Sequence, residues 1–278
     1  MSIQSVSISG AAVYWSVSSS TQLDALTAGL AAVGLERFAP NQPTMTVAVK
    51  AALTDLYAGP RVLIRPDRGG FSVVNEQAGA LGLIHTTRLT VQFSGPAVSV
   101  SPPDDPDFSR IVAAIQGQRE LVPVAALTQM LTAIVRSLGG IQLRQTGGFY
   151  WIPARSLGLW RQVMSAVNSA GPNEVSMLTT IVDDAAVAAV SAALTAEMEA
   201  EVRQMTDELA TGLSERAMKR RSEQLTALVN RLKDYEASLG TTLDTLRQSL
   251  VTLETGLIAS AGGAEFGGGA ASAFGDFF

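Results

Sequence analysis

Residues 139–153 read GGIQLRQTGGFYWIP, and this stretch indicates the type of fold. Two short runs, 141–144 and 149–152, are rich in aromatic and β-branched residues and flank a Thr-Gly-Gly turn, which predicts a β-hairpin. Pro153 has no amide hydrogen to donate to a neighbouring strand, so it marks the end of the hairpin. Apolar residues at helical spacing over 127–138 predict a helix that stops at the glycine pair.

The same order of elements occurs earlier in the chain. In each copy two helices precede two strands, and the predicted elements are residues 23–33, 44–57, 62–65 and 71–76 in the first copy and residues 108–115, 125–138, 141–144 and 149–152 in the second. Both hairpins turn through Gly-Gly-Phe, and both first strands close on an arginine, Arg65 or Arg144. We therefore predict a divergent internal repeat. The alternative is a chance similarity between two pieces that each combine helices and strands.

Further strands and one more helix surround the two copies. Strands are predicted over 11–17, 83–93, 97–100 and 175–182, and a helix over 157–167. The strands over 83–93 and 97–100 are expected to extend the sheet of the first copy. A segment rich in proline and aspartate, 101–107, marks the seam between two modules.

The segment 183–260 has the pattern of long amphipathic helices. Apolar residues recur about every 3.7 positions over 187–213 and about every 3.6 positions over 225–257. Gly212 and Gly240 are the expected turns, so the pattern predicts a long coiled-coil hairpin. Its apolar stripes need cover, either from the same chain folding back or from a second chain. We favour a homo-oligomer formed through these helices.

The segment 261–278 is rich in glycine and is expected to be a flexible tether. It carries an apolar and acidic tip formed by Phe274, Asp276, Phe277 and Phe278. Such a tip is suited to docking in a pocket of a partner protein or of a neighbouring subunit. In style it is similar to the tails of bacterial and phage single-stranded DNA-binding proteins, although Asp276 stands where those tails have a run of acidic residues.

The predicted fold class is therefore α+β, with two related helix-helix-hairpin modules, a long helical coiled-coil hairpin and a flexible tail. The predicted domains are a first αβ module with extra strands over 1–100, a second αβ module over 101–182, the helical region over 183–260 and the tail over 261–278.

Residues that carry catalysis or hold metals are scarce. The chain has no cysteine and a single histidine, His85, and it lacks the His-x-x-His and Glu-x-x-His spacings of metal sites. It also lacks a Walker motif, a Gly-x-Gly-x-x-Gly after a strand and a Gly-x-Ser-x-Gly elbow. We therefore expect a protein that is not an enzyme and has no cofactor or metal. The N-terminal residues do not resemble a signal peptide and no long apolar run is present, which predicts a cytoplasmic protein that does not enter a membrane.

Charge is distributed unevenly along the chain. Residues 1–170 contain 12 Lys or Arg and 9 Asp or Glu, a net charge of +3, whereas residues 171–278 contain 8 and 16, a net charge of −8. Only the first part is therefore suited to a polyanion. The alternative is an ordinary mixed surface, because the excess is modest.

The order helix, helix, hairpin is similar to that of a winged-helix module over residues 107–153 and, more weakly, 20–76. This resemblance implies that the second helix enters a DNA major groove and that the hairpin contacts phosphates. The helix over 125–138 departs from that pattern, because Arg136 is its only charged residue. An aromatic hairpin that stacks unpaired bases is the other way to bind nucleic acid.

Two function hypotheses follow. The first is an oligomeric protein that binds nucleic acid, preferentially single-stranded DNA, and recruits a partner through its tail. Its candidate contacts are arginines and aromatic residues of the two hairpins: Arg65, Arg68, Phe71, Arg144, Tyr150, Trp151 and Arg155. The second is a structural or scaffolding protein, such as a phage or particle component, that assembles through its helices and tail.

Overall fold

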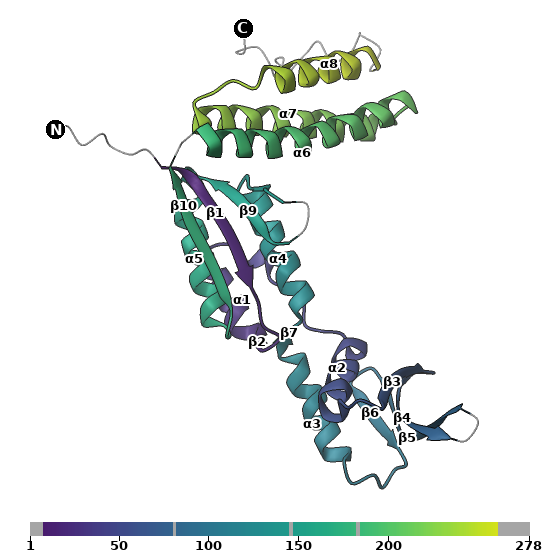
Figure 1. Ribbon diagram of the computed structural model, residues 1–278. Helices are drawn as coiled ribbons and strands as arrows, with labels where there is room; N and C mark the ends of the chain where they lie inside the picture. Colours follow the sequence, from purple (N-terminus) through teal and green to yellow (C-terminus); the bar gives the residue numbers. More distant parts are fainter. Residues whose placement is uncertain (1–7, 80–81, 145–146, 182–183, 261–278) are drawn as a thin grey trace, which may run out of the picture. The chain divides into compact units, whose positions relative to one another are not determined.

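The computed structural model describes residues 8–79, 82–144, 147–181 and 184–260, which form a mixed α+β fold (Figure 1). Contacts divide the chain into two units. We call residues 1–15, 132–161 and 175–278 the bundle unit, and residues 16–131 and 162–174 the ribbon unit. Helices α4 (Val124–Ser137) and α5 (Leu157–Ser169) contribute residues to both units.

This division differs from the expected modules 1–100 and 101–182. Strand β1 (Ile8–Ser16) pairs with β9 (Phe149–Pro153), and β2 (Thr21–Gln22) pairs with β7 (Leu121–Val122). Strand pairing therefore joins the predicted first module to the predicted second module. The predicted seam misses this because local patterns do not specify which distant strands pair.

Helix packing also crosses the predicted repeat. Helix α2 (Met45–Tyr57), from the first copy, packs against α3 (Phe108–Arg119), from the second. The helices of one copy thus lie with those of the other rather than forming two separate modules. The winged-helix order predicted from the sequence is not confirmed.

The bundle unit contains a four-stranded sheet in the order β10-β1-β9-β8. The predicted hairpin is confirmed, because β8 (Ile141–Gln142) pairs antiparallel with β9. Gly139, with φ of +78°, stops α4 as predicted, since this left-handed backbone conformation favours glycine. The fourth strand, β10 (Glu174–Ile181), follows α5, and the short helix η2 (Ala154–Ser156) links β9 to α5.

The rest of the bundle unit consists of α6 (Asp184–Ala210), α7 (Glu215–Leu239) and α8 (Asp244–Ser260), which lie side by side (Figure 1). The predicted turns are confirmed, with φ of +82° at Gly212 and +66° at Gly240. The predicted coiled-coil hairpin is not confirmed, because the segment forms three helices that fold back on one another.

The apolar stripes of these helices are covered within the chain. Their buried residues are Val190, Leu194, Met198, Met205, Met218, Leu225, Leu228, Val229, Leu232, Tyr235, Leu239, Leu246, Leu250, Leu253 and Leu257. Folding back therefore supplies the cover that the sequence requires, and the stripes no longer argue for pairing with a second chain.

In the ribbon unit, four strands form a sheet in chain order: β3 (Val62–Asp67), β4 (Gly70–Gly79), β5 (Gly82–Ser94) and β6 (Ala97–Ser101). This confirms that two further strands extend the first hairpin. Helices α2 and α3 pack against one face of the sheet, around Phe71, Leu89 and Ile111. Strands β4 and β5 outrun their neighbours, since β3 reaches Asn75 and β6 reaches Thr90. Beyond these points they continue as a two-stranded ribbon (Figure 1).

In the ribbon unit β2 leads into α1 (Leu23–Ala31) and then into η1 (Glu36–Phe38). A set of hydrogen bonds made by one buried side chain, Asn173, fixes the segment around β2. The side-chain oxygen of buried Asn173 accepts hydrogen bonds from the amide of Ser18 at 2.9 Å and from Thr21 Oγ1 at 3.0 Å. Its side-chain amide donates to the carbonyl of Val167 at 2.9 Å. Asn173 thereby satisfies the Val167 carbonyl near the end of α5 and joins it to residues 18–21.

Candidate functional site

The seven predicted nucleic-acid contacts are distributed over both units. Arg65, Arg68 and Phe71 belong to the ribbon unit. The other four, Arg144, Tyr150, Trp151 and Arg155, belong to the bundle unit. The tip residues Phe274, Asp276, Phe277 and Phe278 lie outside the described residues.

The expectation that the hairpins present aromatic rings to a ligand is wrong. Trp151 is 1% exposed, and its ring lies 5.3 Å from that of Tyr235 on α7. Tyr150 is 6% exposed and stacks on Trp15 of β1, with ring centroids 5.2 Å apart. Phe71 belongs to the core under α2 and α3. The second hairpin supplies an inner strand, β9, and its four buried residues, 150–153, alternate between the two faces of the sheet, so both faces are covered.

The predicted arginines have different surroundings. Arg155 forms an ion pair with Asp234 of α7 at 2.6 Å. Arg65 is exposed on the sheet of the ribbon unit, 3.4 Å from the Nδ1 atom of His85. Arg68 is exposed in the turn between β3 and β4. Arg144 is the one predicted contact that lines a pocket described in the bundle unit.

This pocket, of about 760 Å³, lies between the segment that begins with β8 and helix α6. Five charged side chains line it: Arg136, Arg144 and Arg231, together with Glu197 and Glu201. Alanines of α6 complete much of its wall and leave room for a ligand; they are Ala193, Ala196 and Ala200. We call it the arginine pocket.

Arg231 forms ion pairs with both glutamates of the arginine pocket. Its guanidinium lies 2.9 Å from Glu197 and 3.5 Å from Glu201, and it donates to the carbonyl oxygen of Gly140 at 3.4 Å. Its buried Nε has no hydrogen-bond partner among the described residues. Arg231 therefore joins α6 and α7 to the glycine that precedes β8.

Burial raises the pKa of the Glu201 carboxyl, and the neighbouring carboxylate of Glu197 adds to this. Arg231 and Arg136 oppose the shift. The sequence offers only a weak signal for these groups, because Glu197 and Glu201 share a helix face in a generally acidic segment. What places them opposite Arg136 and Arg144 is the packing of α6 against the sheet segment.

Neither unit has the net positive charge of residues 1–170. The ribbon unit contains 8 Lys or Arg and 10 Asp or Glu, a net charge of −2. The bundle unit contains 12 and 15, a net charge of −3. Chain segments from both sides of residue 170 intermix, so the electrostatic support for a polyanion is confined to local clusters.

A second candidate surface is the free edge of β5. Among the described residues, no strand pairs with the outer side of β5 before Thr90. Leu83 is 65% exposed and Ile84 is 54% exposed on this edge. Residues 83–87 read Leu-Ile-His-Thr-Thr and contain no lysine, glutamate or proline.

A bulge sets the limit of this edge. Between β4 and β5 the register shifts at Val73 and Val74, which leaves Arg88 as the extra residue of β5. Arg88 donates to Asp107 at 2.9 Å and lies over the ring of Tyr57. Because a bulge bends and twists a strand, it separates the ribbon beyond it from the sheet that α2 and α3 cover.

Residues 109–260, which make up more than half of the chain, match the model of DUF6744, a family of unknown function. The chain belongs to this family. No curated protein and no solved structure matches it. In this DUF6744 protein the match contains every residue of the arginine pocket, whereas the free edge of β5 precedes it.

The described residues of the DUF6744 protein contain neither a membrane-spanning helix nor a cluster of metal-binding side chains. No helix in that part of the chain is long and apolar enough to cross a membrane. Nor does that part bring together three or more His, Asp or Glu side chains in an arrangement that would hold a metal ion.

Proposed function

We propose that this DUF6744 protein is a structural component without catalytic activity that assembles through its ribbon. In this proposal the free edge of β5 pairs with the same edge of a second copy. The observation that carries it is the exposure of Leu83 and Ile84 on a strand edge that contains none of the usual blocking residues. Exposed edges are templates for strand addition, and proteins that avoid it place lysine or proline there.

The sequence of the edge is compatible with two-fold pairing. An antiparallel pair centred on His85 sets Ile84 opposite Thr86 of the second copy, and Leu83 opposite Thr87. Such an interface is isologous, because each strand supplies the same residues. Pairs of β-branched residues across antiparallel strands are favourable.

Light scattering coupled to size exclusion tests this proposal on the full chain. We expect a dimer at about 100 μM protein and a monomer for the variant Ile84→Lys, since a lysine on an edge strand opposes strand addition. Leu178→Lys is the matched control, because Leu178 is 56% exposed on β10 of the bundle unit and should leave the mass unchanged. A monomeric wild type, or a dimer that survives Ile84→Lys, refutes assembly through β5.

The second candidate function is binding of single-stranded DNA. It is favoured by Arg136 and Arg144, which line the arginine pocket without a carboxylate within ion-pair distance among the described residues. In this version the arginines contact phosphates, and the buried Tyr150 and Trp151 have no stacking role.

Fluorescence anisotropy with a labelled oligothymidine at two salt concentrations tests this candidate. We expect salt-dependent binding that the double variant Arg136→Ala, Arg144→Ala weakens at least about tenfold. Arg65→Ala, Arg68→Ala removes the same charge from the ribbon unit and serves as the control. Affinity weaker than about 100 μM at low salt, or equal loss in the two double variants, refutes the arginine pocket as the binding site.

A further inference from the structure

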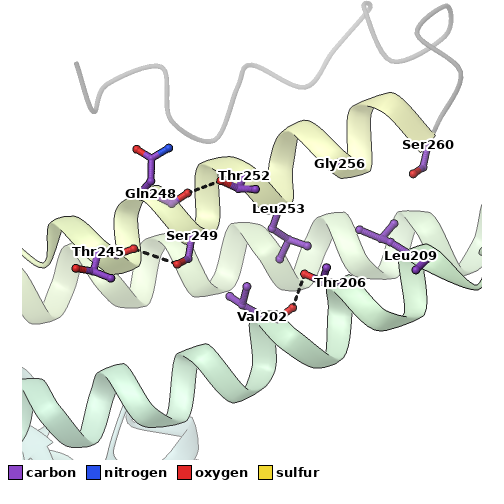
Figure 2. A pocket seen from close by; sticks show the side chains of 11 residues that line it. Val202, Thr206, Leu209, Thr245, Gln248, Ser249, Thr252, Leu253, Gly256 and Ser260 are labelled. Atoms are coloured by element: carbon purple, nitrogen blue, oxygen red, sulfur yellow. Dashed lines mark hydrogen bonds between the residues drawn. The ribbon is translucent and has the colours of Figure 1, made fainter.

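A groove of about 720 Å³ runs between α6 and α8 (Figure 2). The apolar side chains of Val202, Leu209 and Leu253 point into it. Gly256 leaves the α8 side open, because a side-chain carbon added there would meet nothing closer than Leu209, 3.9 Å away. The wall of the groove at Gly256 is therefore open to a side chain of a bound segment.

Three of the five hydroxyl groups that line the groove bond to carbonyl groups of their own helices. Thr206 donates to the carbonyl oxygen of Val202, Ser249 to that of Thr245 and Thr252 to that of Gln248 (Figure 2). Each of these hydroxyls is satisfied by its own helix, one turn back. What the threonines add to the groove is largely their methyl groups, so its interior suits an apolar ligand.

We propose that this groove binds the aromatic tip of the same chain, residues 274–278. The groove extends to Ser260, the last residue of α8, and the segment 261–278 continues directly from that residue. Three phenylalanines in the tip supply rings of the apolar kind that the groove accepts. The occupant is thus already tethered at the end of its own binding site.

The tether is long enough for this arrangement. Thr245 and Ser260, at the two ends of the groove on α8, are separated by about 22 Å of helix at 1.5 Å per residue. The chain between Ser260 and Phe274 can span up to about 45 Å when extended. The tip can therefore turn back and reach any point of the groove, and its effective concentration there is high.

Disulfide trapping tests the proposal, and the absence of cysteine makes the experiment clean. In the full chain, Gly256→Cys with Phe277→Cys should form a disulfide under mild oxidation at least about tenfold faster than Ile258→Cys with Phe277→Cys. Ile258 is a suitable control because it is exposed on α8 and does not line the groove. Equal rates for the two pairs would overturn the proposal.

Mixing isotopically labelled and unlabelled chains before oxidation identifies the source of the tip. Disulfides within one chain support docking of the tip on its own groove, whereas mixed disulfides assign the groove to a second copy and overturn the proposal.

Hydrogen exchange supplies a readout without cysteines. Changing Phe274, Phe277 and Phe278 to serine should speed exchange in residues 245–256, whereas Phe266→Ser should not. Unchanged exchange in the triple variant also counts against docking. Neither result depends on the free edge of β5 or on DNA.

Discussion

The hydroxyl of Tyr235 donates a hydrogen bond to the carbonyl oxygen of Gly139, the residue that ends α4. The ring of Tyr235 also packs on Trp151, which lies on the hairpin that follows this glycine. One residue of α7 therefore contacts both parts of the stretch that predicted the fold. The contact explains why the helices and the hairpin share a single core.

Replacing Tyr235 should separate the two contributions of this side chain. Tyr235→Phe keeps the ring and leaves a carbonyl without its partner, so we expect a loss of about 1–2 kcal/mol in the free energy of unfolding. Tyr235→Ala also removes the ring from the core and should cost about 3–5 kcal/mol. Urea denaturation followed by tryptophan fluorescence measures both. Equal losses for the two variants would show that the ring contact with Trp151 contributes nothing.

Removing the charge of Arg231 and removing the charge of its partner Glu201 should change the free energy of unfolding in opposite directions. Arg231→Met leaves Glu197 and Glu201 without their cation and the Gly140 carbonyl without a donor, and should destabilise the protein by about 1–2 kcal/mol, since the ion pairs are partly exposed. Glu201→Gln should be neutral or stabilising at pH 7. The reason is that the fold raises the pKa of Glu201, so its ionised form is disfavoured in the folded state and stability rises as pH falls.

Denaturation of wild type and Glu201→Gln at pH 5 and pH 7 is the measurement. The advantage of Glu201→Gln should shrink at the lower pH, because the wild-type carboxyl is then closer to its protonated form. A variant that is markedly less stable than wild type at pH 7 would contradict this account of the arginine pocket.

Tyr57 should make the stability of the ribbon unit sensitive to alkaline pH. Its hydroxyl donates to Asp107 at 2.9 Å, and burial together with this bond raises the pKa of Tyr57 to about 12. The folded state therefore favours the protonated phenol. This contribution is fully present below about pH 10, the ordinary value for tyrosine, and is lost as pH rises toward 12.

Tyr57→Phe cannot ionise at this position, so it provides the comparison. The variant should be less stable than wild type at pH 8, because it lacks the bond to Asp107, and the difference should narrow between pH 10 and pH 11. Urea denaturation across this range measures it. A difference that stays constant would mean that Tyr57 is not protected from ionisation.

Two glycines of the helical segment should respond oppositely to alanine. Gly240 has φ of +66° and caps α7, so Gly240→Ala should cost about 1 kcal/mol. Gly256 lies inside α8, where an added Cβ would make only ordinary van der Waals contact with Leu209, so Gly256→Ala should stabilise by about 0.5–1 kcal/mol. Thermal denaturation of both variants tests this pair, and a stabilising Gly240→Ala would be inconsistent with the left-handed cap.

Much of the local structure was predictable from the residues alone. The hairpin of residues 141–152, the stop at Gly139 and the turns at Gly212 and Gly240 all follow from short-range rules of periodicity and backbone conformation. These rules act over a few residues, so a single chain segment contains the information that they need.

The sequence by itself thus determined the order of most helices and strands and their approximate bounds, and that long apolar stripes had to be covered. Only the tertiary structure decided that β1 pairs with β9, that Trp15 and Tyr235 pack on the hairpin rings, and that Arg144 lines the same pocket as the glutamates of α6. The physical reason is that such partners are chosen by packing and strand pairing between distant segments. Periodicity shows that a residue is buried, but not what buries it.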